Sequence, residues 1–168
     1  YAVERVKMEI RNLGYNKVVL KSDQEVSIKA LKMKVKEALK DVEIVPEESP
    51  VGEHQSNGEI ENAVQRIQGQ LRTIKDGLET RIGRPIPGNH LMIPWMVSHA
   101  AETIKRESIG KDGRTAYERH RGRKYLKDVP EFGENVHYLK LGSVGRDKLD
   151  SRWSEGVFLG VRDESGEY

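Results

Sequence analysis

Two carboxylates, Asp23 and Glu61, stand at positions where they could bind a divalent metal ion. Asp23 directly follows the strand-like run of residues 17–22, and Glu61 lies just after the start of a long helical pattern that opens at Ser56. Magnesium and manganese prefer oxygen ligands, and Mg²⁺ binds through a few carboxylates while keeping water or phosphate oxygens in its other positions. Two such ions can activate an attacking oxygen and stabilise a leaving one in phosphodiester chemistry. The pair therefore predicts a metal-dependent nuclease or strand-transfer site.

The strand and the helix decide where these carboxylates lie. Ligand sites in α/β proteins form outside the carboxyl ends of the strands, and Asp23 would lie at such an edge. Glu61 has Ile60 and Val64 as apolar neighbours, which we expect to face the core. Glu61 would then be held near the sheet but off the buried stripe.

Each carboxylate alone also has an ordinary explanation. An Asp after a strand is more often a turn or capping residue, and a Glu in a first helical turn is favoured by the helix dipole. Glu59 has such an explanation, because it lies three residues after Ser56 and completes a capping box. Glu61 has no comparable local role.

A polar stripe lies on the same face of this helix as Glu61. Basic side chains on such a stripe can contact the phosphates of a nucleic acid, and side-chain amides can contact the edges of its nucleobases. The stripe is therefore a candidate nucleic-acid interface, with a plain solvent face as the alternative. Its members are Gln65, Gln68, Arg72 and Lys75.

The remaining elements follow from hydrophobic periodicity and from Gly and Pro. The apolar run Val18-Val19-Leu20 has no polar alternation, so we expect a strand covered on both faces. We expect a weaker strand over 42–45 that ends at Pro46, and the long helix to end near Gly83. The sequence also predicts helices up to Leu13 and over 28–39, 90–107 and 115–124, and strands over 136–139 and 156–161.

Composition limits the possible classes of protein. The chain has 168 residues, of which 36% are hydrophobic, and its mean hydropathy is −0.71, which suits one domain with a modest core, with or without a small appendage. There are no cysteines, which excludes disulfides, a thiol nucleophile and Cys-containing zinc sites. No apolar run approaches the roughly 20 residues of a membrane span.

Charge is distributed unevenly, although the net charge is only +2. Residues 41–62 hold seven acids and no Lys or Arg, whereas residues 104–127 hold nine bases against three acids, a net charge of +6. Such asymmetry suggests a polyanionic partner near a site that binds cations. Two solvated segments are the alternative explanation.

Three blocks together resemble the integrase catalytic core of retroviruses and long-terminal-repeat retrotransposons, most closely the copia type. Residues 20–23 (Leu-Lys-Ser-Asp) look like the strand that delivers the second Asp of the family's Asp-Asp-Glu triad. Residues 50–61 look like the loop and helix start that deliver the Glu, with the family's Gln-Ser-Asn-Gly before it. Residues 148–152 and 156–160 are similar to the segment after the core in copia-type polyproteins. The likeness covers most of the chain and is loose over 84–130.

The resemblance implies an α/β protein with a ribonuclease-H-like fold lacking its first strands, followed by a helical extension and a small β-rich C-terminal segment. It implies a polynucleotidyl transferase that processes the 3′ ends of retroelement DNA and joins them to target DNA with two Mg²⁺ (or Mn²⁺) ions. Asp23 and Glu61 would be catalytic residues and metal ligands. DNA and further copies of the chain would be its partners, in the nucleus or cytoplasm. The loop at the DNA would be formed by His54, Gln55, Ser56 and Asn57.

Two departures from the family pattern matter. The family's first Asp would precede Tyr1, and Gln24-Glu25 replace the Asn-Gly that usually follows the second Asp. The family's Cys/His zinc module is also missing. We therefore expect a piece of a longer polyprotein, which binds metal poorly and is inactive alone. Its expected parts are a truncated core (1–83), a helical basic extension (84–128) and a β-rich segment (129–168).

A second function also fits the sequence. The missing first Asp and the basic run of 104–127 suit a non-catalytic nucleic-acid-binding or scaffolding domain of a decayed element.

Overall fold

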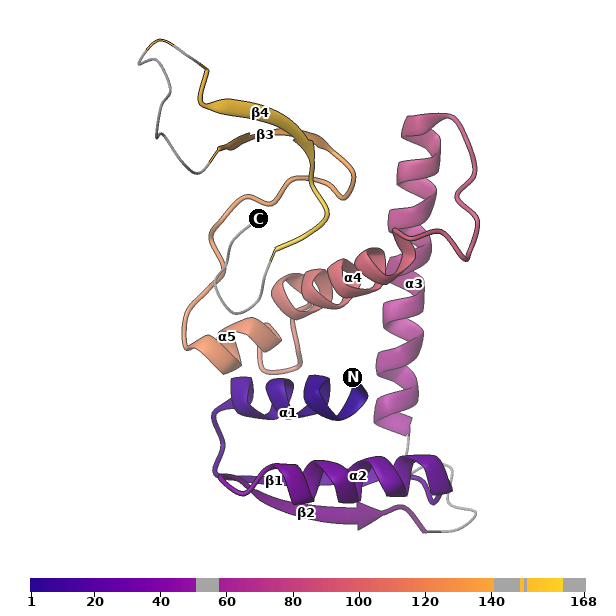
Figure 1. Cartoon of the computed structure of the whole chain (residues 1–168), viewed down its shortest axis with the longest axis vertical. Helices are drawn as coiled ribbons and strands as arrows, with labels where there is room; N and C mark the ends of the chain where they lie inside the picture. The colour runs from indigo at the N-terminus through magenta and orange to yellow at the C-terminus, as the bar shows by residue number, and fades with distance from the viewer. Residues whose placement is uncertain (51–57, 141–148, 150, 162–168) are drawn as a thin grey trace. The chain divides into compact units, whose positions relative to one another are not determined.

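The computed structural model is a mixed α/β protein and describes residues 1–50, 58–140, 149 and 151–161 (Figure 1). Over these residues it has five helices and two two-stranded sheets. The chain divides into two compact units, Tyr1–Gln65 and Arg66–Tyr168. None of the helices in the described part of the chain combines the length and the apolar character that crossing a bilayer requires.

The first unit alternates helices and parallel strands. Helix α1 (Ala2–Leu13) ends at Gly14, whose φ of 72° is the left-handed conformation that glycine adopts at helix ends. Strand β1 (Lys17–Ser22) runs parallel to β2 (Glu43–Glu48), and α2 (Val26–Ala38) connects them. Parallel neighbours require such a crossover. The predicted helices and the first strand are confirmed.

Both helices cover one face of this sheet. Ile10 of α1, Val35 of α2 and Ile44 of β2 are buried in one cluster, with Val18 and Leu20 packed against it. The opposite face is open, because burial alternates along β1 and Val19 is 52% exposed. The expectation that β1 is covered on both faces is therefore wrong for the described residues. An unbroken apolar run does not indicate which face of the strand other elements will cover.

Strand β2 also differs from its predicted end. It runs through Pro46, which lies opposite Leu20. The backbone N–H of Glu43 donates to Asn16 O (2.8 Å), and that of Ser49 donates to Ser22 O (2.9 Å). Since successive N–H groups point to opposite sides of a strand, the nitrogen of Pro46 points away from β1. Proline is tolerated there because no ladder bond is lost.

The second unit contains most of α3 and all later elements. Helix α3 (Gly58–Ile82) begins before the division, and α4 (Ile93–Glu107) and α5 (Ala116–Arg121) follow. Strands β3 (Asn135–Leu139) and β4 (Trp153–Val157) pair antiparallel, with Leu139 opposite Trp153. The last strand was predicted over 156–161, which is too far along the chain. The residues around Gly156 carry no local signal that sets which of them pair with β3.

The core of the second unit joins residues that are distant in sequence. Leu78, Ile86, Met96 and Phe132 are buried together. Near them, the ring of His99 packs against Phe132, with centroids 5.5 Å apart, and against Phe158 at 5.8 Å. This shared core spans the predicted divisions at 83/84 and 128/129, so those divisions differ from the two units of the structure.

Candidate functional site

Asp23 lies where the sequence predicted, directly after the carboxyl end of β1, and it is exposed. Its Oδ1 accepts a long hydrogen bond from Glu25 N (3.4 Å), and its carbonyl accepts one from Ser22 Oγ (2.8 Å). The first contact is the turn role expected of an ordinary Asp. This hydrogen bond is long and uses one of the two carboxylate oxygens, so the Asp23 carboxylate is still suited to binding a hard cation.

The segment after Asp23 is fixed by contacts to the end of β2. Gln24 Nε2 donates to Ser49 O (3.3 Å), and Ser49 N continues the ladder to Ser22. Gln24 thus has a structural role after β1. The segments that follow β1 and β2 are therefore held together by hydrogen bonds at the edge of the sheet where Asp23 lies.

Lysines of α2 reach the same edge. Lys32 is only 6% exposed, and its Nζ donates to Glu47 O (2.8 Å). Lys29 forms an ion pair with Glu48 (3.0 Å). A buried ammonium group needs such partners, because its desolvation is otherwise costly. These contacts anchor α2 to the end of β2.

Glu61 lies in the first turn of α3, as the sequence predicted, and its side chain is exposed. Its neighbours Ile60 and Val64 are 62% and 46% exposed, so the expectation that they face the core is wrong. Among the described residues, the apolar stripe joins a core cluster from Leu71 onward. The periodicity of the helix was correct, but tertiary contacts cover only part of its apolar face.

The structure places the two carboxylates on the predicted elements without a contact between them. No hydrogen bond or ion pair of the described residues joins Asp23 to Glu61. The residues outside the gaps at 51–57, 141–148, 150 and 162–168 contain no cluster of three or more His, Cys, Asp or Glu that could hold a metal. A pair of carboxylates is smaller than such a cluster, so metal binding by Asp23 and Glu61 stays a prediction.

The loop residues predicted to contact DNA lie outside the described residues. They are His54, Gln55, Ser56 and Asn57. The predicted capping box of Ser56 with Glu59 needs Ser56, so it is not described either.

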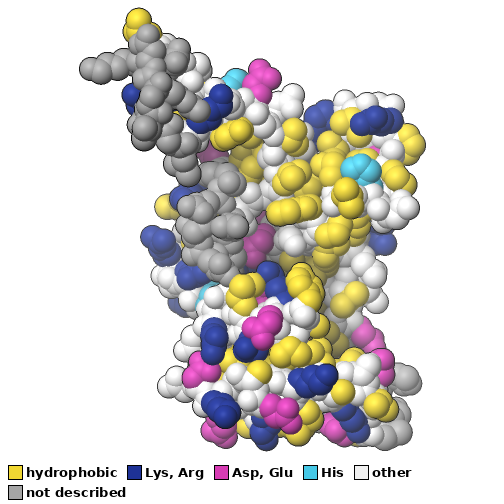
Figure 2. All heavy atoms as spheres, viewed as in Figure 1, with side chains coloured by type: hydrophobic (Ala, Val, Ile, Leu, Met, Phe, Trp, Pro, Cys, Tyr) yellow, Lys and Arg dark blue, Asp and Glu magenta, His cyan; other side chains and the backbone are white. Residues whose placement is uncertain are grey.

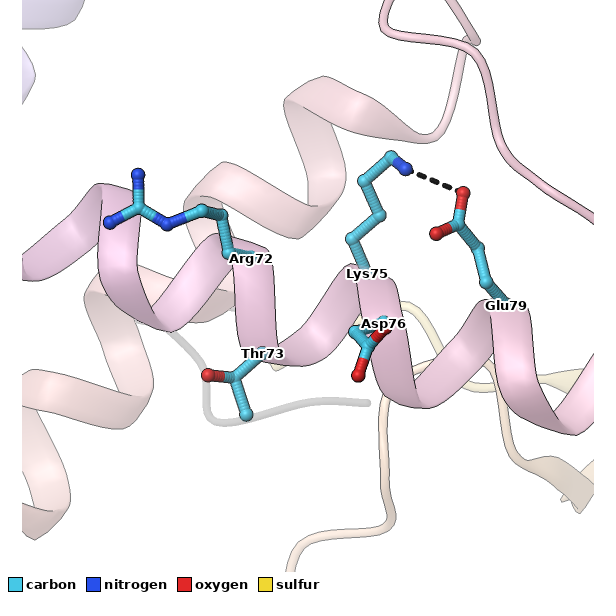
Figure 3. Close-up of a pocket in the computed structure, with 5 residues that line it drawn as sticks. All are labelled: Arg72, Thr73, Lys75, Asp76 and Glu79. Carbon is cyan, nitrogen blue, oxygen red and sulfur yellow. Dashed lines mark hydrogen bonds and ion pairs between the residues drawn. The ribbon is translucent and has the colours of Figure 1, made fainter.

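The polar stripe on α3 is less basic than its sequence suggested. Gln65, Gln68 and Arg72 are exposed, but Lys75 pairs with Glu79 at 2.5 Å (Figure 3). Glu79 also accepts a hydrogen bond from the Ile86 backbone N–H, and these two contacts, the backbone one first, lower its pKa.

A shallow hollow on this part of α3 is lined by Arg72, Thr73, Lys75, Asp76 and Glu79, whose side chains are drawn in Figure 3. Within that hollow the positive charge of Lys75 is balanced by Glu79, and Asp76 adds a further negative charge. Phosphate binding there would have to compete with the Lys75–Glu79 pair. The candidate nucleic-acid stripe therefore has Arg72 as its remaining base.

The short helix predicted over 115–124 is present as α5. Thr115 and Glu118 form a reciprocal capping box, with Glu118 N donating to Thr115 Oγ1 (3.1 Å) and Thr115 N to Glu118 Oε2 (2.7 Å). The Thr-x-x-Glu spacing is visible in the sequence and is a known helix-start signal. The helix therefore begins where the sequence predicted, with Thr115 as its N-cap, but it ends at Arg121 because Gly122 takes the left-handed conformation of a C-cap.

A search of protein-family models, curated proteins and solved structures finds no match to this chain.

Proposed function

We propose that this chain is part of a DNA integrase core, a polynucleotidyl transferase in which Asp23 and Glu61 hold Mg²⁺ or Mn²⁺. The main support is topological. Asp23 leaves the carboxyl end of β1, and the helix that carries Glu61 follows the carboxyl end of β2, its parallel neighbour. Parallel strands end at the same edge, which is where α/β proteins bind ligands.

The first unit also has the features of an incomplete sheet. Parallel sheets normally have both faces covered, yet in the described part of the chain this one has two strands, and Val19 lies on its open face. The outer edge of β2 contains Pro46, which cannot donate there, so that edge suits the border of a sheet. The outer edge of β1 has no proline. Further strands therefore fit beside β1, which supports a ribonuclease-H-like fold that lacks its first strands.

In the proposed mechanism, the bound metal ions would supply activation of an attacking oxygen and stabilisation of a leaving one. Asp23 and Glu61 would supply oxygen ligands from a strand end and a helix start. Gln24 and Lys32 would keep the strand ends in place, through the contacts to Ser49 O and Glu47 O. The third acidic ligand would come from the strands beside β1.

The test uses the chain extended upstream within its parent reading frame, assayed for strand transfer with Mg²⁺ and Mn²⁺. We expect Asp23→Asn and Glu61→Gln each to lower the rate by about 100-fold or more, because each removes a direct ligand. Glu59→Gln is the matched control, since it neutralises an acid in the same helical turn, and it should keep the parental rate. Thermal unfolding should show that all variants remain folded.

Two results would end the catalytic proposal. One is an extended chain in which Asp23→Asn and Glu61→Gln transfer strands as fast as Glu59→Gln. The other is an extended chain that binds DNA tightly but has no metal-dependent activity.

The second of these results would favour the other candidate function, a non-catalytic nucleic-acid-binding or scaffolding domain. The observation that supports it is the surplus of exposed bases around α5. In that case DNA binding would be sensitive to salt and indifferent to both carboxylate substitutions.

A further inference from the structure

The segment of residues 109–127, called the basic platform below, is an ordered part of the second unit. Ile109 and Thr115 form an antiparallel bridge, and Gly110 N donates to Arg114 O (2.8 Å). Gly113 takes the left-handed conformation of the turn, with φ of 77°. The capping box of α5 then fixes where the short helix begins.

The acidic side chains of the basic platform, Asp112 and Glu118, form contacts within the platform itself. Arg119 binds Asp112 with two nitrogens, Nε to Oδ2 at 2.9 Å and Nη2 to Oδ1 at 2.5 Å. This guanidinium group holds the pKa of Asp112 well below its usual range. Glu118 is held by the capping box. Neither acid therefore remains to neutralise other bases of the platform.

The last part of the platform is held against α4. The guanidinium carbon of Arg106 lies 4.5 Å from the centroid of the Tyr125 ring, and Tyr117 meets the same ring edge to face at 5.2 Å. Arg106 is buried and paired with Glu102 at 3.1 Å. The chain on both sides of Tyr125 is therefore positioned by packing rather than left as a tail.

Several exposed bases of the platform have no ion pair among the described residues. On the face drawn in Figure 2, Lys and Arg side chains lie near α5 and also over the first unit. In the first unit, by comparison, Lys17 and Lys21 of β1 pair with Glu43 and Glu47. That unit also has exposed bases without an ion pair among the described residues, namely Lys34, Lys36 and Lys40. The surplus bases of the platform are Lys111, Arg114, Arg123, Lys124 and Lys127.

We propose that the basic platform is a docking surface for the phosphate backbone of duplex DNA, without base specificity. Duplex DNA has about one negative charge per 1.7 Å of its axis, and exposed Lys and Arg bind it by releasing counterions. A membrane surface fits less well, because α5 has six residues and membrane-bound helices need a broad apolar face. Neither Asp23 nor Glu61 is needed for this binding.

The test measures binding of the whole chain to a labelled duplex by fluorescence anisotropy, with EDTA present and salt varied from about 50 to 200 mM. EDTA removes any metal-dependent contribution, so the result is independent of the proposed catalytic site. The test variant replaces Arg123, Lys124 and Lys127 with Gln. The control variant replaces Lys34, Lys36 and Lys40 with Gln, which are exposed on and just after α2 and change the net charge equally.

We expect the platform variant to lose about 10-fold or more in affinity and the slope of log K against log salt to fall by about 2.7, since each phosphate contact contributes about 0.9. In the control variant, the affinity and the salt slope should both change much less. Arg114→Gln with Lys111→Gln provides a second test within the platform if the first variant unfolds. Duplexes of unrelated sequence should bind equally well.

Four outcomes would overturn the proposal. Equal losses in the platform and control variants would show that only net charge matters, and an unchanged slope would show that the platform makes no phosphate contacts. Tighter binding to phosphatidylserine vesicles than to DNA would assign the surface to membranes. A strong preference for RNA of the same length would assign it to RNA.

Discussion

Gly133 is a position at which one added methyl group should destabilise the second unit strongly. It has φ of 76°, and a Cβ placed on it would lie 2.7 Å from Leu78 Cδ1. Leu78 is 3% exposed and packs with Ile86, Met96 and Phe132, so it has little space to move. Gly133→Ala therefore combines an unfavourable backbone conformation with an overlap in the core.

Both effects can be given a size. A left-handed conformation costs a residue with a Cβ about 1–2 kcal/mol, and overpacking a core costs about 1–3 kcal/mol. We expect Gly133→Ala to lower the free energy of unfolding by about 2–5 kcal/mol. Gly113→Ala is the matched control, because its φ is 77° and a Cβ there meets nothing within 4 Å. It should lose only about 1–2 kcal/mol.

A double substitution separates the two effects. Leu78→Ala alone should cost about 2–5 kcal/mol through the cavity it leaves. When Gly133→Ala is combined with Leu78→Ala, the added methyl group has space, so the overlap disappears and the backbone cost remains. The double variant should therefore be more stable than the sum of the single effects by about 1–3 kcal/mol.

Urea unfolding measured by tryptophan fluorescence is a suitable assay, because Trp95 and Trp153 both lie in the second unit. The m-value should stay constant, so that midpoints report stability. Two results would refute the reasoning. One is a cost of Gly133→Ala no larger than that of Gly113→Ala, and the other is additivity of Gly133→Ala and Leu78→Ala within about 0.5 kcal/mol.

Two further predictions concern α4. The pKa of His99 is lowered mainly by burial and also by the charge of Arg106. As the pH falls, His99 is therefore protonated in the unfolded chain before it is protonated in the folded one. The stability of the second unit should be full above pH 6.5 and should fall as the pH drops toward the lower pKa of the folded state. Urea midpoints between pH 5 and 8 would show this slope in the parent and not in His99→Gln, and equal slopes would contradict it. Arg106→Met should cost about 1–3 kcal/mol, because it removes the buried guanidinium from Glu102 while the longer contact of Lys105 to that carboxylate (3.5 Å) stays. Arg106→Lys keeps the charge and should cost less, and equal stability of the Met variant and the parent would contradict the role of the pair.

The sequence predicted the elements of the fold better than their surroundings. Helical periodicity placed α1, α2 and most of α3, and Gly14 and Gly83 marked two helix ends, because these signals arise within a few residues. The same local patterns placed Asp23 at a strand end and Glu61 in a first helical turn. Whether these two carboxylates share a metal ion depends on contacts between segments that no local pattern contains.

Tertiary structure alone decided which faces of these elements are covered. Val19 and Ile60 belong to apolar patterns but are exposed, since burial requires a partner from elsewhere in the chain. Arg106 is part of a basic run but is buried, because Glu102 and Tyr125 surround its guanidinium group. Sequence periodicity thus determined which helices and strands form, and long-range packing determined which of their charges and apolar side chains remain available for a partner.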